Sequence, residues 1–100
     1  MSGATEMDVI ERSDCPSGGA YRVQVDGHLA EMTFSRAGAH MIIIDHTEVP
    51  EALRGRGVGD RLVARAVRDA REQGFVIFPL CPFAASRFRK HPEYRDVLSK

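Results

Sequence analysis

Three side chains with reactive groups stand at or just beyond the ends of two apolar stretches. His46 and Glu48 follow the stretch 41–45, and Cys81 follows the stretch 75–78. A histidine titrates near neutral pH and a carboxylate accepts protons, so either residue could act as a general base or relay. A cysteine thiolate is a nucleophile. These residue types predict nucleophilic or acid–base chemistry if the fold brings the two stretches together.

Each of these residues also has a structural interpretation. His46 could bond to neighbouring backbone, Glu48 could be a solvated carboxylate at a strand end, and Cys81 could be a small packing residue. Cys15 lies in a segment rich in serine and glycine and is not a candidate. Because side chains alternate along a strand, His46 and Glu48 are expected to share one face.

A glycine-rich stretch lies between these groups, with the letters Arg54-Gly55-Arg56-Gly57-Val58-Gly59. Glycines let the backbone turn sharply, and the N–H groups at the start of a following helix attract anions. The stretch therefore predicts a pyrophosphate-binding turn, although the same letters also suit a plain helix entry. A Walker loop is excluded because no Gly-Lys pair occurs, and a dinucleotide fingerprint is excluded because Asp60 stands at its third glycine.

The composition is that of a globular protein, with 43% hydrophobic and 28% charged residues among 100. We expect a flexible N-terminus over 1–7 and one domain over 8–100. No apolar run of about 18 residues and no signal-like start occur, which predicts no membrane partner. Two distant cysteines predict neither a disulfide scaffold nor a metal site. A cytoplasmic location with free thiols is expected.

Charge divides the chain into two unlike halves. Residues 1–50 hold three arginines against eight acidic residues, and residues 51–100 hold eleven basic against six acidic residues. The basic half starts at the glycine-rich stretch, which suits an anionic ligand. Its arginines are not interleaved with stacking aromatics, so a nucleic-acid partner is poorly supported.

Antiparallel strands are expected in the first half. Residues 8–12 suggest a short strand and Ser13–Gly19 a turn, while alternation predicts strands at 21–25 and 29–35 around an Asp26-Gly27 hairpin. The continuous apolar run 41–44 indicates a central strand covered on both faces.

The second half changes period. Apolar residues at helical spacing predict a helix of about sixteen residues from Val58 to Gln73, followed by a strand at 75–78 and helices at 84–90 and 93–98. A strand, a helix and a strand in succession imply a parallel crossover. The expected fold class is α+β, with a mixed, mostly antiparallel sheet and a central crossover helix.

Several separated motifs resemble the GNAT superfamily of N-acetyltransferases, in particular a subgroup of small stand-alone members. They are His46-Thr47-Glu48-Val49, Leu53 to Gly59, Pro79-Leu80-Cys81-Pro82 and His91-Pro92-Glu93-Tyr94. The resemblance covers about residues 6–98. It implies a minimal GNAT-like fold in which the N-terminal helices of larger members are missing.

The resemblance also implies roles for particular residues. In this superfamily two neighbouring strands splay apart around the pantetheine arm of acetyl-coenzyme A. Glu48 and Val49 would line the arm, and the pyrophosphate would meet the backbone N–H groups of Arg54, Gly55, Arg56, Gly57, Val58, Gly59 and Asp60. Cys81 would lie near the thioester, where the subgroup characteristically has cysteine. Catalysis would then draw on Cys81, Glu48 and His46.

The sequence thus favours an acetyl-coenzyme A-dependent N-acetyltransferase whose amine acceptor, a small molecule or a protein amine, is not specified. Transfer could be direct or could pass through Cys81. The alternatives are a coenzyme A-binding module without turnover and, less favoured, a basic nucleic-acid-binding protein. No metal is expected, and the oligomeric state is open.

Overall fold

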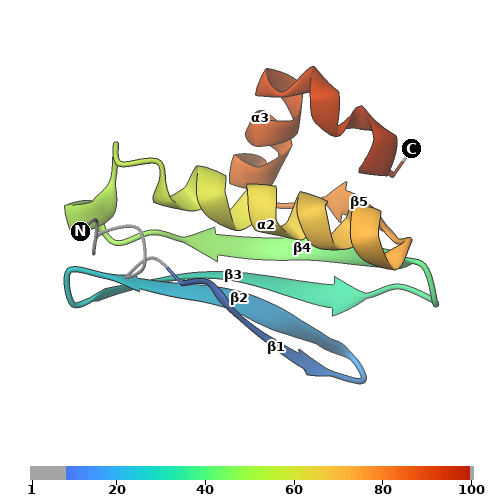
Figure 1. Ribbon diagram of the computed structural model, residues 1–100, viewed down its shortest axis with the longest axis horizontal. Helices are drawn as coiled ribbons and strands as arrows, with labels where there is room; N and C mark the ends of the chain where they lie inside the picture. Colours follow the sequence, from blue (N-terminus) through green and yellow to red (C-terminus); the bar gives the residue numbers. More distant parts are fainter. Residues whose placement is uncertain (1–8, 100) are drawn as a thin grey trace.

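The computed structural model describes residues 9–99. The segment 1–7, expected to be flexible, lies outside the described residues. Five strands form one sheet in the order β1-β2-β3-β4-β5, and the helices pack against one face of it (Figure 1). The elements in chain order are β1 (Glu11–Cys15), β2 (Gly18–Val25), β3 (His28–Arg36), β4 (Met41–Glu48), the 3-10 helix η1 (Glu51–Leu53), α2 (Val58–Gln73), β5 (Val76–Pro79), α3 (Pro82–Lys90) and the 3-10 helix η2 (Pro92–Val97).

The sheet is mixed, as the sequence predicts. Strands β1 to β4 pair antiparallel with their neighbours, and β5 pairs parallel with β4. Helix α2 makes the crossover between those two parallel strands. The expected α+β class with a mostly antiparallel sheet is confirmed.

Helix α2 covers the sheet with one apolar face. Its buried residues are Val58, Gly59, Leu62, Val63, Ala66, Val67, Asp69 and Ala70. All of these except Gly59 and Asp69 join one hydrophobic core with the buried sheet residues Tyr21, Met32, Ile42, Ile44 and Ile77. The helix ends at Gly74, which adopts the left-handed conformation (φ 79°) and returns its N–H to Ala70. The predicted helix is confirmed at both ends.

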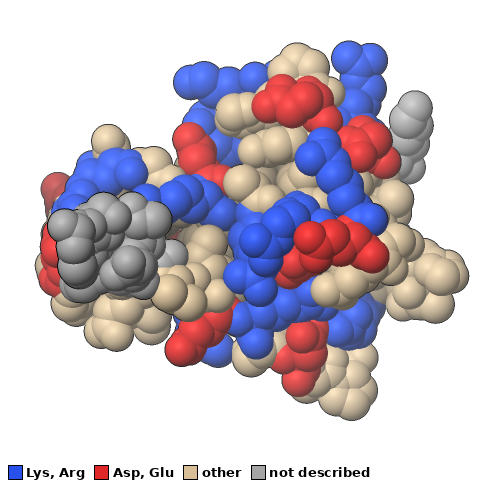
Figure 2. All heavy atoms as spheres, viewed as in Figure 1, with Lys and Arg blue, Asp and Glu red and all other residues tan. Residues whose placement is uncertain are grey.

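The other face of α2 carries arginines that are largely neutralised. Figure 2 shows basic side chains gathered over this helix with acidic groups among them. Arg65 contacts Asp69, Arg68 contacts Glu72, and Arg71 contacts Asp96 in η2. These pairs leave less free positive charge than the sequence suggests, which further weakens the case for a nucleic-acid surface.

The hairpin between β2 and β3 is as predicted, whereas the one between β1 and β2 differs from its prediction. Asp26 and Gly27 both have positive φ, as a two-residue type I′ turn requires. The predicted turn over Ser13–Gly19 is wrong, because β1 runs to Cys15 and the turn is Pro16-Ser17. The first strand, predicted over 8–12, is present but shifted to Glu11–Cys15, and residue 8 lies outside the described residues. Gly18 and Gly19 lie within β2, where a Cβ on Gly18 would collide with the Phe34 carbonyl oxygen and a Cβ on Gly19 with that of Ser13. These glycines therefore allow close strand approach rather than a turn.

The expectation that β4 is covered on both faces is also wrong. Ile42 and Ile44 are buried against the helices, whereas Met41 and Ile43 are half-buried on the opposite face. Within residues 9–99 no helix packs on that face (Figure 1), which is called the open face below. The continuous apolar run therefore reflects one buried and one half-exposed row.

The C-terminal elements differ in detail from their predictions. Helix α3 starts at Pro82 rather than at residue 84, since proline fits the first helical position. The predicted last helix 93–98 is a 3-10 helix over Pro92–Val97. Both elements pack onto the same core as α2, through Ala84, Phe88 and Val97.

One charged cluster is built into the core between the sheet and α2. Asp69, 3% exposed, accepts hydrogen bonds from the Tyr21 hydroxyl at 2.9 Å, Arg12 Nη1 at 3.0 Å and Arg65 Nε at 3.3 Å. Burial alone would raise the pKa of Asp69, but these bonds and the charge of Arg65 outweigh it and hold the pKa below its usual range. Burial and the bond to Asp69 raise the pKa of Tyr21. The cluster ties β1 and β2 to α2.

Candidate functional site

The site forms where β4 and β5 part. Their parallel pairing ends at Ile44 and Pro79, after which the N–H of Cys81 donates to the Ile44 carbonyl at 3.1 Å. Strand β4 continues to Glu48 paired with β3, while the chain after β5 turns into α3. The divergence leaves the last residues of β4 facing the start of α3 rather than another strand.

A β-bulge at Asp45 decides which side chains of β4 face the helices. Ile44 pairs with Phe34 and His46 pairs with Thr33, so Asp45 is the extra residue. Thr47 pairs with the buried Met32 and therefore lies on the helix side, because directly opposed residues share a face.

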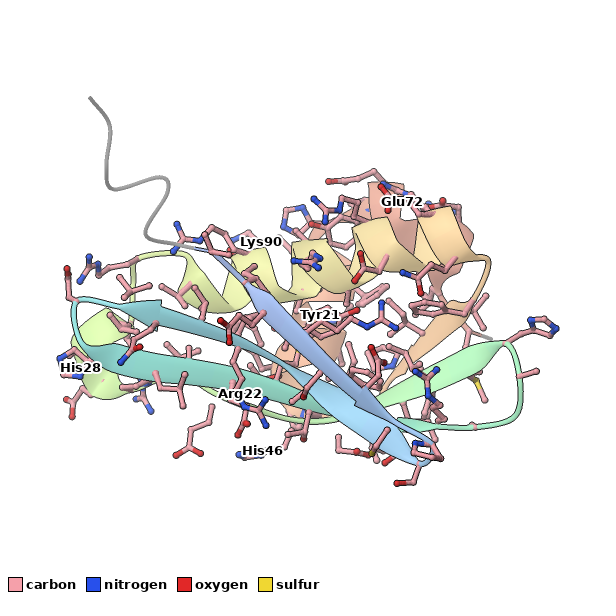
Figure 3. The ribbon with its side chains drawn as sticks, turned by 60° about the horizontal axis from the view of Figure 1, so that its bottom comes forward. Tyr21, Arg22, His28, His46, Glu72 and Lys90 are labelled. Carbon is pink, nitrogen blue, oxygen red and sulfur yellow. The ribbon has the colours of Figure 1, made fainter. Side chains whose placement is uncertain are left out.

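The same bulge sends His46 and Glu48 to the open face. Glu48 pairs with Glu31, which forms an ion pair with Arg22 on that side. Figure 3 shows Arg22 and His46 on the side of the sheet away from α2, whereas Tyr21 lies toward it. The side chains of His46 and Glu48 are 67% and 76% exposed, and Nε2 of His46 lies 3.9 Å from Oε1 of Glu48. The sheet thus separates them from Cys81.

Cys81 occupies the N-cap position of α3. Its residue is 6% exposed, and its Sγ accepts a hydrogen bond from the Ala84 N–H at 3.3 Å. The Thr47 hydroxyl lies 3.3 Å from the same sulfur. The thiol is therefore held between the end of β4 and the first turn of α3, in a position fixed from both sides.

The glycine-rich stretch uses its three glycines in two ways. Gly55 (φ 79°) and Gly57 (φ 74°) adopt the left-handed conformation, and a Cβ at either would meet no atom within 4 Å. Gly59 has a different role, because a Cβ there would lie 2.5 Å from Cζ of Phe83 in α3. Two glycines shape the turn and face open space, while the third lets α3 pack against α2.

Gly57 is the N-cap of α2 and has no side chain to bond the first helical N–H groups. The N–H groups of Val58, Gly59 and Asp60 lie in the first turn, where a helix has no internal acceptors. Such a helix start attracts anions through these donors and through its dipole.

A pocket of about 390 Å³ lies in front of this helix start. Its walls come from the end of β4, the glycine-rich stretch, α2 and α3. The lining residues are Thr47, Val49, Leu53, Arg54, Gly55, Gly57, Val58, Gly59, Asp60, Phe83 and Arg87. The pocket is apolar along the valine, leucine and phenylalanine side chains and polar at the helix start, so it suits a long ligand with an anionic group.

The charged residues of this region have distinct partners. Arg54 lines the pocket and is exposed, whereas Arg56 Nη2 lies 2.8 Å from Asp26 Oδ2 in the β2–β3 turn. Asp60 pairs with Arg87 at 3.0 Å, and both line the pocket. Arg87 also lies over the Phe83 ring, 5.3 Å from its centroid. The Asp60 carboxylate at the helix start is thus countered by a cation from α3.

The structure gathers most of the residues that the sequence singles out, but not all. Seven residues predicted to bind a cofactor line the pocket, namely Val49, Arg54, Gly55, Gly57, Val58, Gly59 and Asp60. Cys81 adjoins it through Thr47. Arg56 is held by Asp26, and His46 and Glu48 lie on the open face.

Four residues line the pocket without having been assigned to the site from the sequence, namely Thr47, Leu53, Phe83 and Arg87. Thr47 stands between two candidates, His46 and Glu48, and strand alternation alone indicates that it faces the other way. Phe83 and Arg87 are four residues apart on α3, a spacing that places them on one helical face.

Residues 9–99 hold no helix long and apolar enough to cross a bilayer. The same residues hold no group of three or more histidine, cysteine or acidic side chains placed to bind a metal ion.

Comparison with known proteins gives consistent results. Residues 20–97 match the family model described as GCN5-related N-acetyl-transferase. A solution structure of a GCN5-like protein from Staphylococcus aureus is 32% identical, with a TM-score of 0.74 over 99% of this chain and 91% of that chain. An IAA acetyltransferase from Bacillus cereus is 19% identical and shares the fold, with a TM-score of 0.63 over 82% of this chain and 73% of that one. Comparison with curated protein sequences gives no significant match.

Proposed function

Because this chain belongs to the family of GCN5-related N-acetyltransferases, we propose that it transfers an acetyl group from acetyl-coenzyme A to an amine. The observation that carries the proposal is the pocket at the start of α2, whose lining residue Thr47 touches the buried thiol of Cys81. A thiol, a helix start suited to an anion and an apolar pocket wall thus adjoin one another.

The residues of the pocket fit the chemical parts of the coenzyme. The first N–H groups of α2, with Gly57 contributing no capping side chain, suit a pyrophosphate. The side chains of Val49, Leu53 and Phe83 suit the largely apolar pantetheine arm. Arg54 supplies positive charge at the same place, and Arg87 could contact a phosphate by leaving Asp60.

When bound, acetyl-coenzyme A supplies a thioester carbonyl. The Cys81 thiolate attacks that carbonyl carbon with its electron pair, and the bond from the same carbon to the coenzyme sulfur breaks. The coenzyme leaves as a thiolate and takes up a proton from water. A neutral amine then attacks the acetylated Cys81, releasing its sulfur as thiolate, and the amide nitrogen gives up one proton. Both steps conserve charge once these two protons are counted.

His46 and Glu48 remain proposed acid–base groups. Their position on the open face fits an acceptor that approaches from that side of the sheet, beyond the point where β4 and β5 part. An amine needs to lose a proton to attack, and an exposed imidazole or carboxylate there could receive it. His46→Ala and Glu48→Gln should then lower the rate of the amine step and leave acetylation of Cys81 unchanged.

A second candidate function is coenzyme A binding without turnover. One observation favours it: within the described residues, the side-chain and backbone groups bonded to the Cys81 sulfur are Thr47 and Ala84, neither of which is a general base. Such a protein would bind coenzyme A through the same pocket.

One experiment separates the two candidates. Purified protein is incubated with acetyl-coenzyme A and a panel of small amines and peptides, and the released thiol is measured alongside affinity by calorimetry. Acceptor-dependent release of coenzyme A supports the transferase. Binding without release across the panel favours the binding protein, and failure to bind contradicts both.

Arg54 and Arg56, on either side of Gly55, test the assignment of the pocket. Arg54→Gln removes a cation that lines it, so we expect affinity for coenzyme A to fall about tenfold, as for one charge-assisted hydrogen bond. Arg56→Gln removes a side chain already paired with Asp26, so its effect should be clearly smaller. Calorimetric titration with coenzyme A measures both, and an equal or reversed order contradicts the assignment.

A further inference from the structure

The side chains of Thr47 and Cys81 meet across the gap between β4 and α3. Thr47 Oγ1 lies 3.3 Å from Cys81 Sγ, although the two residues are 34 positions apart in the chain. Thr47 is half-buried and lines the pocket, whereas Cys81 is buried behind it. Thr47 is therefore the side chain through which the pocket adjoins the thiol.

The two hydrogen bonds to the Cys81 sulfur differ in which partner can donate. The Ala84 N–H can only donate, and it holds the sulfur as an acceptor at 3.3 Å. A hydroxyl can accept or donate by rotating its hydrogen, with no movement of its oxygen. The Thr47 hydroxyl can therefore accept from the S–H of a neutral thiol and donate to a thiolate.

We propose that Thr47 is a positioning residue for Cys81, holding the sulfur beside the pocket and donating its hydroxyl hydrogen to the thiolate. The thiol proton leaves to water before attack, and the hydroxyl hydrogen stays on Thr47 throughout. A role of Thr47 in acetyl transfer rests on the proposed function. Its effect on the reactivity of the Cys81 thiol does not, and can be measured on the protein without coenzyme.

The reactivity of the thiol tests the assignment without any coenzyme. Alkylation by iodoacetamide is followed by intact-protein mass spectrometry across a range of pH. All variants carry Cys15→Ser, because Cys15 is exposed and a hydrogen bond with Ser17 lowers its pKa, so it would react as well. Thr47→Val keeps the shape and removes the hydroxyl, and Thr47→Ser restores a hydroxyl.

We expect Thr47→Val to slow alkylation about tenfold near neutral pH, the size of one hydrogen bond to a charged group. The difference between the variants should vanish at high pH, where every thiol is ionised. Thr47→Ser should stay close to the parent. Thr33→Val is the matched control, since Thr33 pairs with His46 on the open face.

An unchanged pH profile in a folded Thr47→Val protein would overturn the assignment. A Thr47→Ser protein that reacts as slowly as Thr47→Val would also overturn it, because packing rather than the hydroxyl would then matter. Acetylation of Cys81 is measured in parallel. If the alkylation profile moves as expected while the parent forms no acetyl adduct, the positioning role of Thr47 stands and transfer through Cys81 fails.

Discussion

Replacement of Cys81 by serine is expected to abolish the acetyl adduct and to lower kcat by roughly a thousandfold or more, as loss of a nucleophile does elsewhere. Serine preserves the N-cap acceptor for the Ala84 N–H and the contact with Thr47, so α3 should stay in place. The adduct is measured by rapid quenching and intact-protein mass spectrometry after mixing with acetyl-coenzyme A, and kcat by release of free thiol.

Two controls make this result specific. Affinity for coenzyme A should be nearly unchanged in Cys81→Ser, because Cys81 lies behind Thr47 rather than in the pocket lining. Cys15→Ser, in the exposed strand β1, should behave as the parent. Turnover that survives in Cys81→Ser, with no adduct in the parent under fast quenching, would instead show that the amine attacks the bound thioester directly.

The largest effect on stability is expected from Asp69→Asn. This change keeps the volume of the side chain but leaves Arg12 and Arg65 without their buried counter-charge. Breaking one partner of such a buried pair typically costs about 3–5 kcal/mol, a large fraction of the stability of a small domain. Chemical denaturation at pH 7 measures it. Tyr21→Phe removes one hydrogen bond to the same carboxylate and should cost about 1 kcal/mol.

The same cluster predicts a dependence on pH. The pKa of Asp69 is lowered in the folded state, so its contribution is present above the unfolded value of about 3.9 and is lost as the pH falls through the lower folded value. The difference in unfolding free energy between the parent and Asp69→Asn should therefore be constant near neutral pH and shrink in acid. A difference that persists undiminished well below pH 4 would mean that the carboxylate charge is not what stabilises the cluster.

The sequence predicts correctly those elements that are determined by residues close together in the chain. The helix Val58–Gln73 follows from apolar spacing and from Gly74, and the hairpin at Asp26-Gly27 follows from turn residues that tolerate positive φ. The turn over Ser13–Gly19 fails for a complementary reason. Gly18 and Gly19 look like turn residues, but they lie in β2, where the close approach of β1 and β3 leaves no room for a side chain.

The site divides in the same way. The glycine-rich stretch before a helix can be predicted from the local sequence. The partner of Arg56 cannot, because it is Asp26, thirty residues earlier in a hairpin. Thr47 and Cys81 meet only because β4 and β5 part, which no local pattern encodes. The separation of His46 and Glu48 from Cys81 depends on one irregular residue in a ladder, and irregularities of that kind leave little trace in composition.

That residue, Asp45, determines which side chains at the end of β4 face Cys81. In a regular strand His46, two residues after Ile44, would lie on the same face as Ile44 and so on the side of the thiol. Because the bulge adds one residue, Thr47 lies on that face instead. Point substitution can change what stands at each position but cannot exchange the two rows. Deletion of Asp45 would remove the bulge and leave His46 opposite Thr33. Closure of the bulge with every residue kept would exchange the rows, because Asp45 would then pair with Thr33 and His46 with Met32, which sets an imidazole on the side of Cys81 in place of the Thr47 hydroxyl.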